Sequence, residues 1–363
     1  MDDIYYWLAL LRVPRIGPIH FQALLSQYGD PRQVFERAPH DESVRRALPE
    51  AALHGLTNPD WRTAEADLAW AGRAGAHLLP LNDPRYPALL KEIHDPPPVL
   101  FVLGDIEALG ARQVAIVGSR NPSPVGSDTA LQFAAELARS GLVITSGLAI
   151  GIDGAAHRGA VTAGGRTIAV MGNGLDIVYP PRHRELAQRI RERGALVSEF
   201  PPGSQPLPEC FPRRNRLISG LSLGTLVVEA APRSGSLITA RAALEQGREV
   251  FAIPGSIHNP RARGCHLLLR QGAKLVECAQ DILEEVSPAG VMTPAAAQAR
   301  NGPSATLETT AARVLESIDF APTAIDALVE RTGIAAERLY SILLTLEMSD
   351  HISPVPGGYA RRR

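Results

Sequence analysis

Cysteine is scarce in this sequence, and its three cysteines form no recognisable pattern. Cys210, Cys265 and Cys278 stand far apart, and no Cys-x-x-Cys or Cys/His spacing occurs in the 363 residues. These features exclude a disulfide framework and a cysteine–histidine metal site. Long apolar runs are also missing, since none approaches the roughly 20 residues that cross a membrane. The Met-Asp-Asp start lacks the basic segment that opens a signal peptide. We therefore expect a cytoplasmic protein with no metal and no membrane partner.

Two glycine-rich fingerprints of nucleotide binding are missing as well. The turn after the first apolar run of the middle segment reads Gly-Ser-Arg-Asn-Pro-Ser-Pro-Val-Gly instead of G-x-G-x-x-G. The next strand ends in Thr145-Ser146-Gly147, without the carboxylate that would bind a ribose. No G-x-x-x-x-G-K-[ST] segment occurs either. We therefore predict no nicotinamide, flavin or other cofactor, and no ATP hydrolysis.

Lysine is almost absent, and arginine is unevenly distributed. Lys91 and Lys274 are the two lysines among 37 basic residues. Residues 111–286 carry 20 basic against 15 acidic residues, whereas residues 1–110 carry 10 against 15. Arginine binds phosphate bidentately and stacks on bases, so a positive, arginine-rich middle segment indicates nucleic acid or nucleotides. High-GC codon usage is an alternative reason for the ratio of arginine to lysine, but not for the placement.

The two ends of the chain are predicted to be small domains. Residues 1–75 read as short helices with a segment like a helix-hairpin-helix, whose acidic flanks favour a structural or protein-contact role over DNA contact. Residues 287–306 have the composition of a flexible linker. Residues 307–363 show three helical patterns and two short strands, the outline of a winged helix. The last of these helices is the second of a helix-turn-helix pair and carries Glu337, Glu347 and Asp350. These acidic residues favour protein contact or regulation over the reading of duplex DNA.

Residues 76–286 are predicted to form one domain. A connecting stretch over 76–110 contains a short strand at 99–104, and residues 112–286 then alternate between apolar runs and helical patterns. Continuous apolar runs joined by helices predict a parallel sheet covered on both faces. The expected strands of this sheet cover 114–118, 142–145, 167–171, 195–200, 225–230, 249–253 and 274–278.

The loops that follow these strands carry small residues and arginines. Ligands of such sheets bind beyond the carboxyl ends of the strands, and helix N-termini there favour anions. Candidate anion-binding residues are Gly118, Ser119, Arg120, Arg213, Arg214, Arg216, Arg233, Ser234, Gly235 and Ser236. Several such loops at one edge predict a site for a polyanion. We expect Glu199 and Glu229, which end strands, to orient the arginines.

Phe211 and three polar residues each allow two interpretations of their role. Phe211 stands before a run of arginines, and we interpret it as a stacking platform for bases, although it could also tuck under its loop. Asp153 and His157 are interpreted as a helix cap and a packing residue, with catalysis as the alternative. Ser236 is interpreted as a helix cap, because no His or Asp pairs with it in the sequence. We predict no catalytic residue.

With these motifs in view, the chain resembles the DNA-processing protein A (DprA, also called Smf) family. The segment Asp83–Pro87 and the C-terminal winged-helix pattern match this family. The matching segments of the middle part are Val117–Arg120, Ser146–His157, Gly174–Pro180, Phe211–Ser222, Val228–Ala230, Ser234–Ala240 and Ala252–Gly255. This chain departs from the family pattern at Glu209-Cys210, where a basic or amide residue is common, and at His266, where asparagine is usual.

The resemblance implies an α/β fold, in which an extended Rossmann-like sheet is flanked by a helical N-terminal domain, like a sterile-alpha-motif, and a C-terminal winged helix. It implies a homodimer that acts in natural transformation, where it binds and protects incoming single-stranded DNA and loads the RecA recombinase. The DNA pocket implied by the family motifs consists of Gly118, Ser119, Arg120, Phe211, Arg213, Arg214 and Arg216.

An enzyme acting on nucleotides is the alternative hypothesis. The middle segment is distantly similar to nucleoside-monophosphate phosphoribohydrolases, whose mark is Pro-Gly-Gly-x-Gly-Thr-x-x-Glu. The equivalent loop starts at Pro232 and keeps small residues for phosphate, but Thr239 stands where the catalytic Glu would be. We therefore predict a protein that binds single strands and is not an enzyme.

Overall fold

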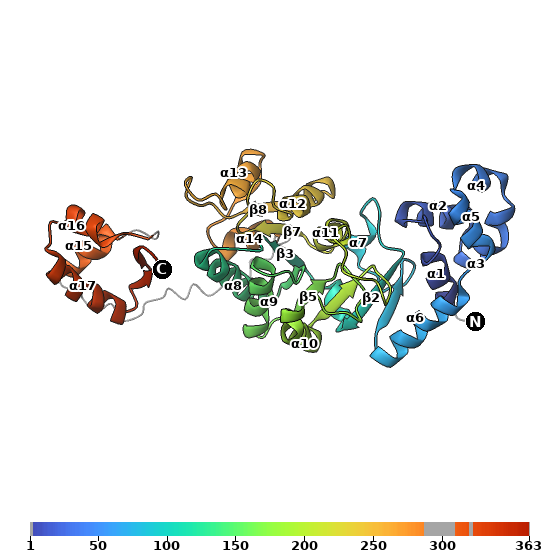
Figure 1. Ribbon diagram of the computed structural model, residues 1–363, viewed down its shortest axis with the longest axis horizontal. Coiled ribbons are helices and arrows are strands. Elements are labelled where there is room, and N and C mark those ends of the chain that lie inside the picture. Colours follow the sequence, from blue (N-terminus) through green and yellow to red (C-terminus); the bar gives the residue numbers. More distant parts are fainter. Residues whose placement is uncertain (1–2, 287–308, 319–321, 363) are drawn as a thin grey trace. The chain divides into compact units, whose positions relative to one another are not determined.

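The computed structural model describes residues 3–286, 309–318 and 322–362. The predicted linker, 287–306, lies outside these residues. The chain forms two compact units, Met1–Ala289 and Gly290–Arg363 (Figure 1). The first unit contains the N-terminal helices and the large sheet, and the second contains the C-terminal helices.

Six helices form the N-terminal part of the first unit. Aspartates begin three of them: the carboxylates of Asp30, Asp41 and Asp60 accept hydrogen bonds from backbone N–H groups of the following turn. Trp7 stacks on Phe21 with ring centroids 5.5 Å apart, and this apolar core continues into strand β2 (Val99–Gly104). The helices are α1 (Asp3–Leu11), α2 (Pro18–Tyr28), α3 (Pro31–Arg37), α4 (Glu42–Ala47), α5 (Glu50–Thr57) and α6 (Trp61–Ala74), with a 3₁₀ turn at Ala38–His40.

A nine-stranded sheet has the order β1-β2-β6-β5-β4-β3-β7-β8-β9. The seven strands from β6 to β9 in this order run parallel to one another, whereas β2 pairs with both β1 and β6 in antiparallel fashion. The strands are β1 (His77–Pro80), β2 (Val99–Gly104), β3 (Gln113–Val117), β4 (Val143–Ser146), β5 (Thr167–Val170), β6 (Ala195–Ser198), β7 (Gly224–Val227), β8 (Glu249–Ala252) and β9 (Lys274–Leu275).

Helices cover both faces of this sheet, which explains why its strands are apolar on both sides. Val114 and Ile116 pack with α8, α9 and α14, whereas Ala115 and Val117 pack with α11, α12 and α13. The helices are α7 (Ala88–Lys91), α8 (Pro124–Arg139), α9 (Ile152–Thr162), α10 (Arg184–Arg193), α11 (Cys210–Gly220), α12 (Ser236–Glu245), α13 (Arg263–Arg270) and α14 (Ala279–Val286), with 3₁₀ turns at Ile106–Gly110 and Pro181–His183.

The second unit is a winged helix, as predicted. Its core is built on Val314, Leu328 and Leu343, one from each helix. Its elements are α15 (Thr309–Ser317), α16 (Ile325–Thr332), α17 (Ala336–Met348), β10 (Ile352–Val355) and β11 (Gly358–Arg361).

The predicted fold class and every predicted strand are confirmed, and the sheet has two features that were not predicted. Strand β1 lies in the stretch that was predicted to be a connection, and β2 is antiparallel to its neighbour β6. Four residues bounded by turns carry too little periodicity to reveal β1 in the sequence.

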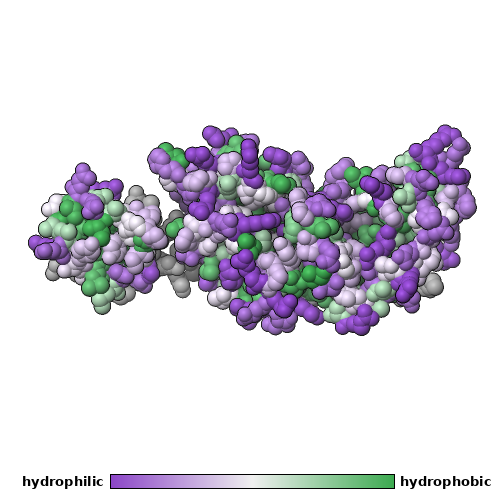
Figure 2. Space-filling view, in the orientation of Figure 1, coloured by the Kyte–Doolittle hydropathy of each residue, from purple (hydrophilic) through white to green (hydrophobic). Residues whose placement is uncertain are grey.

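In the part of the chain that the structure describes, no helix combines the length and hydropathy needed to span a bilayer. Hydrophilic side chains dominate the visible face, and the apolar ones are scattered (Figure 2).

Candidate functional site

The strand order reverses between β3 and β7, so the loops that follow these two strands diverge at the carboxyl edge of the sheet. Open α/β sheets bind their ligands at such a point. A pocket of about 510 Å³ lies there. Its lining includes Gly118, Ser119, Arg120, Asp153, Pro208, Phe211, Arg214, Asn215, Ile218, Arg233, Ser234, Gly235, Ser236, Ile238 and Thr239.

Gly118 and Glu229 shape the first wall of the pocket. A Cβ atom on Gly118 would lie 2.7 Å from Cγ1 of Ile152, so a larger residue does not fit. The carboxylate of Glu229 accepts hydrogen bonds from Ser123 N at 2.8 Å and from Ser123 Oγ at 2.7 Å. Ser123 in turn caps α8. Glu229 therefore braces a helix start, and the prediction that it orients an arginine is wrong.

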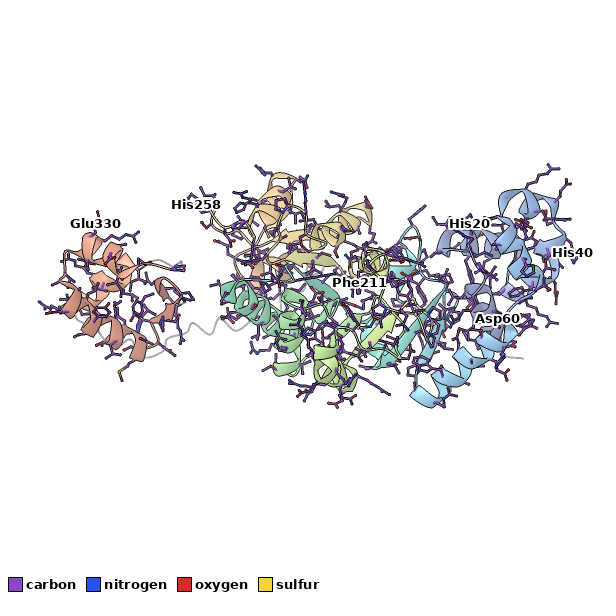
Figure 3. All side chains as sticks on the ribbon, viewed as in Figure 1. His20, His40, Asp60, Phe211, His258 and Glu330 are labelled. Carbon is purple, nitrogen blue, oxygen red and sulfur yellow. The ribbon has the colours of Figure 1, made fainter. Side chains whose placement is uncertain are left out.

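Arg120 and Phe211 meet at the pocket. The guanidinium carbon of Arg120 lies 5.7 Å from the centroid of the Phe211 ring, within the range of a cation–π contact. Tyr179 packs beside Phe211 at a centroid distance of 5.6 Å, and a Cβ on Gly172 would lie 2.9 Å from the ring. Phe211 is half-buried in the first turn of α11 (Figure 3). The ring therefore packs on its neighbours and also lines the pocket, and its role as a platform for bases stays a prediction.

The start of α12 forms the opposite wall. The hydroxyls of Ser234 and Ser236 lie 2.7 Å apart, and Ser236 N donates to Ser234 Oγ at 3.4 Å. Ser234 is therefore the residue whose hydroxyl serves the helix start, and Ser236, predicted as the cap, is the first helical residue. Arg233 is exposed and, like Arg120, has neither a hydrogen bond nor an ion pair among residues 3–286. Both cations are available to an anion.

Arg213 and Arg216 are turned away from this pocket and toward a buried carboxylate. Nη2 of Arg213 lies 3.0 Å and Nη2 of Arg216 lies 2.6 Å from Oε2 of Glu199, whose side chain is only 1% exposed. Nε of Arg216 also lies 2.9 Å from Asp95. Burial raises the pKa of Glu199, and the two arginines oppose that shift. The expectation that Glu199 orients arginines is confirmed, whereas grouping Arg213 and Arg216 with the pocket lining is wrong.

Arg214 forms part of the pocket floor and is only 4% exposed. Its guanidinium donates to the carbonyl oxygens of Gly147, at 2.7 Å, and Val170, and so ties the ends of β4 and β5 together. Burial lowers its pKa to about 10, so the group stays charged at neutral pH. Asp153 accepts from the backbone N–H groups of Gly147 and Ala149, at 3.1 and 3.4 Å. Asp153 therefore holds the loop before α9, and Arg214 is first of all a structural cation.

His157 is a core residue, as the packing interpretation predicts. Its Nδ1 lies 2.7 Å from Oγ1 of Thr167, which donates to the carbonyl of Ile144, so Nδ1 carries the proton. Nε2 is buried without a partner in the described part of the chain. Burial, with repulsion from neighbouring cations, lowers the pKa of His157 to about 3. A neutral imidazole sealed in the core does not fit a catalytic base.

We expect His157 to make the first unit sensitive to acid. Its pKa in the unfolded chain is about 6.5, so the unfolded state takes up the proton first and stability falls between about pH 6.5 and pH 3. From about pH 7 to pH 5, this group should remove about 2 kcal/mol of unfolding free energy. Urea unfolding at the two pH values measures the loss, which should shrink by that amount in a His157→Gln variant. Equal losses in both proteins would contradict the assignment.

Several further residues that line the pocket were not predicted from the sequence. Asn215 reaches from α11 to α12, since its side-chain nitrogen donates to the carbonyl of Gly235 at 3.3 Å. Ile218 and Ile238 supply apolar lining. The signal for Asn215 was its place among the arginines, and nothing in the sequence marked the two isoleucines.

His266, one of the two departures from the family pattern, hydrogen-bonds to the carbonyl of Gly255 at 2.9 Å. Glu209, the other, is exposed just before α11.

Three family models match the chain in sequence order. Residues 77–287 match DNA recombination-mediator protein A, residues 298–358 match the DprA winged helix domain, and residues 1–56 match the DprA-like N-terminal HHH domain. Protein Smf of Escherichia coli is 45% identical over 305 residues, which cover 83% of this chain and 82% of that protein. DNA processing protein DprA of Bacillus subtilis is 41% identical over 279 residues, which cover 76% and 94%.

Two solved structures are similar as well. The X-ray structure of DNA processing protein A from Streptococcus pneumoniae matches with a TM-score of 0.68 and 37% identity, over 79% of this chain and all of that chain. DNA processing protein A from Helicobacter pylori, whose structure was described for its single-stranded DNA binding mode, matches with a TM-score of 0.53 and 30% identity. This match covers 58% of the present chain and 95% of the other.

Proposed function

This chain belongs to the DprA/Smf family of DNA recombination-mediator proteins, and from this premise we propose that it binds single-stranded DNA without cleaving it. The strand would lie over the pocket between β3 and β7. The observation that carries the proposal is a pair of guanidinium groups at this pocket, Arg120 and Arg233, which make no hydrogen bond or ion pair among residues 3–286 and lie at the pocket that the Phe211 ring also lines. Phosphates would meet the cations, and a base would stack at Phe211.

The start of α12 adds to this electrostatic support. The N-terminus of a helix carries a partial positive charge that favours phosphate. Ser234, Gly235 and Ser236 are small enough to let a phosphate approach the backbone. A single strand suits the site better than a duplex, because stacking on Phe211 requires a base that is free of its complement.

Family membership supports the finer parts of the proposal. We propose that the protein acts in natural transformation, where it protects the incoming strand in the cytoplasm and loads the RecA recombinase on it. We further propose that it works as a homodimer. The winged helix does not suit duplex reading, because α17 exposes Tyr340, Leu344 and Met348, the last at 83%. A helix in the major groove needs basic and amide side chains instead.

The residues of the pocket support a binder rather than a nucleotide-cleaving enzyme. No histidine, cysteine or glutamate is among its lining residues in the described chain. Its one carboxylate, Asp153, already accepts two backbone N–H groups. Thr239 stands where a phosphoribohydrolase would carry its acid/base. General acid–base chemistry therefore lacks a suitable side chain here.

We expect Arg120→Ala to weaken binding to all single strands by a similar factor, because a phosphate contact carries no sequence information. Each lost contact should also make the log–log dependence of affinity on salt shallower by about 0.7. Fluorescence anisotropy with a labelled oligothymidylate and a labelled mixed-sequence oligonucleotide, over a salt series, measures both effects.

Arg139→Ala is the matched control for this experiment. Arg139 is an exposed arginine in the last turn of α8, at the opposite edge of the sheet, and is also unpaired within the described residues. The control should retain the affinity and the salt slope of the unaltered protein. An affinity that does not depend on salt, or an equal loss in both variants, would overturn the proposed role of the pocket.

A further inference from the structure

The loop that leads into α11 places part of the pocket. Residues 201–209, here called the 201–209 loop, follow β6 and end directly before the first turn of α11. Pro208 and Phe211, at its end and just beyond it, both line the pocket. A segment without helix or strand holds its geometry only through its anchors. The contacts of this loop therefore determine where Phe211 stands.

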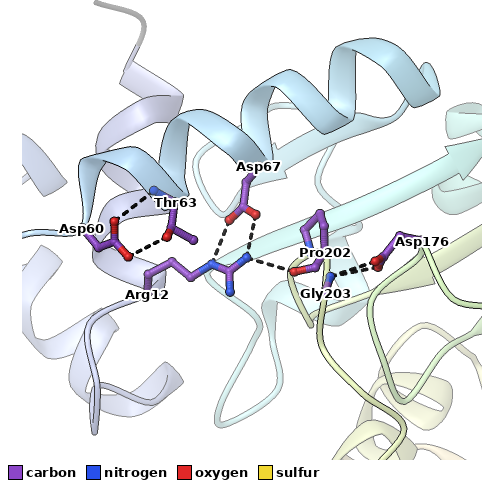
Figure 4. Close-up of polar contacts among 7 residues, drawn as sticks. All are labelled: Arg12, Asp60, Thr63, Asp67, Asp176, Pro202 and Gly203. Atoms are coloured by element: carbon purple, nitrogen blue, oxygen red, sulfur yellow. Dashed lines mark hydrogen bonds and ion pairs between the residues drawn. The ribbon is translucent and has the colours of Figure 1, made fainter.

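One set of anchors comes from the sheet domain itself. The backbone N–H of Gly203 lies 3.0 and 2.9 Å from the two carboxylate oxygens of Asp176. Gly174 N donates to the carbonyl of Ser204 at 3.0 Å. Figure 4 shows the contact between Asp176 and Gly203. Asp176 and Gly174 both belong to the loop after β5, so this side of the 201–209 loop is held by its own domain.

The second anchor comes from the N-terminal helical domain. Nη2 of Arg12, just after α1, donates to the carbonyl oxygen of Pro202 at 3.0 Å (Figure 4). The same guanidinium binds the carboxylate of Asp67 on α6 in bidentate fashion, with Nε–Oδ2 at 2.9 Å and Nη2–Oδ1 at 2.6 Å. The Asp67 side chain is only 4% exposed. The two contacts with Asp67 thus orient a further N–H group of the guanidinium toward the loop. The planar fork of arginine allows this geometry, whereas lysine does not.

The ion pair is not what holds the N-terminal domain in place. Trp7, Leu8 and Leu10 of α1 belong to the same apolar cluster as Phe101 and Leu103 of β2. Burial of this cluster docks the helices on the sheet whatever Arg12 does. The contact with Pro202 therefore has a separate consequence, which is to fix the loop.

We propose that Arg12 is a positioning residue for strand binding: through Pro202 it fixes the 201–209 loop and with it Phe211. The N-terminal domain thereby contributes to the site without touching the strand. This inference rests on the proposed function, because it needs Phe211 to contact the strand. Pre-organising a contact residue raises affinity by removing the cost of ordering it on binding.

A double-mutant cycle with Phe211 tests this inference. The first variant is Arg12→Met with Asp67→Asn, which removes the Pro202 contact and leaves no buried, unpaired carboxylate. Its affinity for a labelled oligothymidylate should fall about fivefold when Phe211 is present. In a Phe211→Ala background the same change should alter affinity by less than about 1.5-fold, because the positioned ring is gone.

Three controls separate positioning from general damage. Asp67→Asn alone should retain affinity, since the amide oxygen still accepts from Arg12. Arg12→Lys should give an intermediate loss, because an ammonium group reaches only one of the two acceptors. Arg32→Met removes an exposed ion pair with Glu36 in the same domain and should have no effect. Thermal melting of each variant identifies any that unfold.

Each outcome of the double-mutant cycle either supports or overturns the positioning role of Arg12. Unchanged affinity in the Arg12→Met, Asp67→Asn variant overturns the inference and leaves the proposed function intact. An equal loss with and without Phe211 also overturns it, because Arg12 would then act through overall stability. A wild-type protein that binds no single strand would overturn both. Loss of affinity confined to the background that retains Phe211 supports the positioning role.

Discussion

Replacing Phe211 with alanine should weaken binding to single-stranded DNA by about 1–3 kcal/mol, or roughly 5- to 150-fold. The ring lines the pocket and is held in place by Tyr179 and by the guanidinium of Arg120. A base stacked on it would lose its platform, and Arg120 would lose the surface over which it lies. Anisotropy titration of a labelled oligothymidylate measures the change.

Phe211→Leu separates stacking from packing. Leucine retains apolar volume beside Gly172 and Tyr179, so the fold around α11 should survive, but it has no aromatic face. The leucine variant should therefore lose most of the affinity that the alanine variant loses, with an unchanged melting temperature. Wild-type affinity in the leucine variant would show that the ring only packs, and the stacking role would have to be abandoned.

Arg214→Met should destabilise the first unit by about 3–5 kcal/mol, because it removes a buried cation that compensates the charge of the buried Asp153 carboxylate. The buried guanidinium ties the carbonyls of Gly147 and Val170, and its charge opposes the effect of burial on the pKa of Asp153. Without Arg214, both carbonyls lose a donor and Asp153 loses a compensating positive charge. The free energy of urea unfolding measures the effect.

The neighbouring Arg213→Met variant is the matched control. Its side chain is half-exposed, and Glu199 keeps its contact with Arg216 when Arg213 is lost. We expect a cost of only about 0.2–1 kcal/mol. Similar losses for the two arginines would contradict the division of this run into a structural residue and a surface residue.

The sequence allowed most of the sheet to be predicted, because its strands are buried on both faces. Runs such as Val114–Val117 are continuous and apolar, and helices separate them, so a parallel sheet is the arrangement that buries them all. The edge strand β1 escaped prediction since its four residues lie between turns. The antiparallel direction of β2 was also hidden, because pairing direction depends on partners distant in the chain.

The candidate site was predicted in part. Gly118, Arg120 and the Ser234–Ser236 turn follow neighbouring strands, and parallel strands bring such loops to one edge. The three arginines around Asn215 looked equivalent, but helical spacing turns them in different directions. Glu199, a dozen or more residues earlier in the chain, takes two of them. Pairing of this kind depends on tertiary structure and has no local signal.

Single-strand binding at this pocket is tested most sharply by a competition between single-stranded and double-stranded oligonucleotides of the same sequence and length. Labelled single strand is bound to the full chain, and each competitor is titrated against it at constant salt. We expect unlabelled single strand to displace the label at a much lower concentration than duplex does, and this preference to disappear largely in the Phe211→Ala variant. Equal displacement by the two competitors would contradict this expectation.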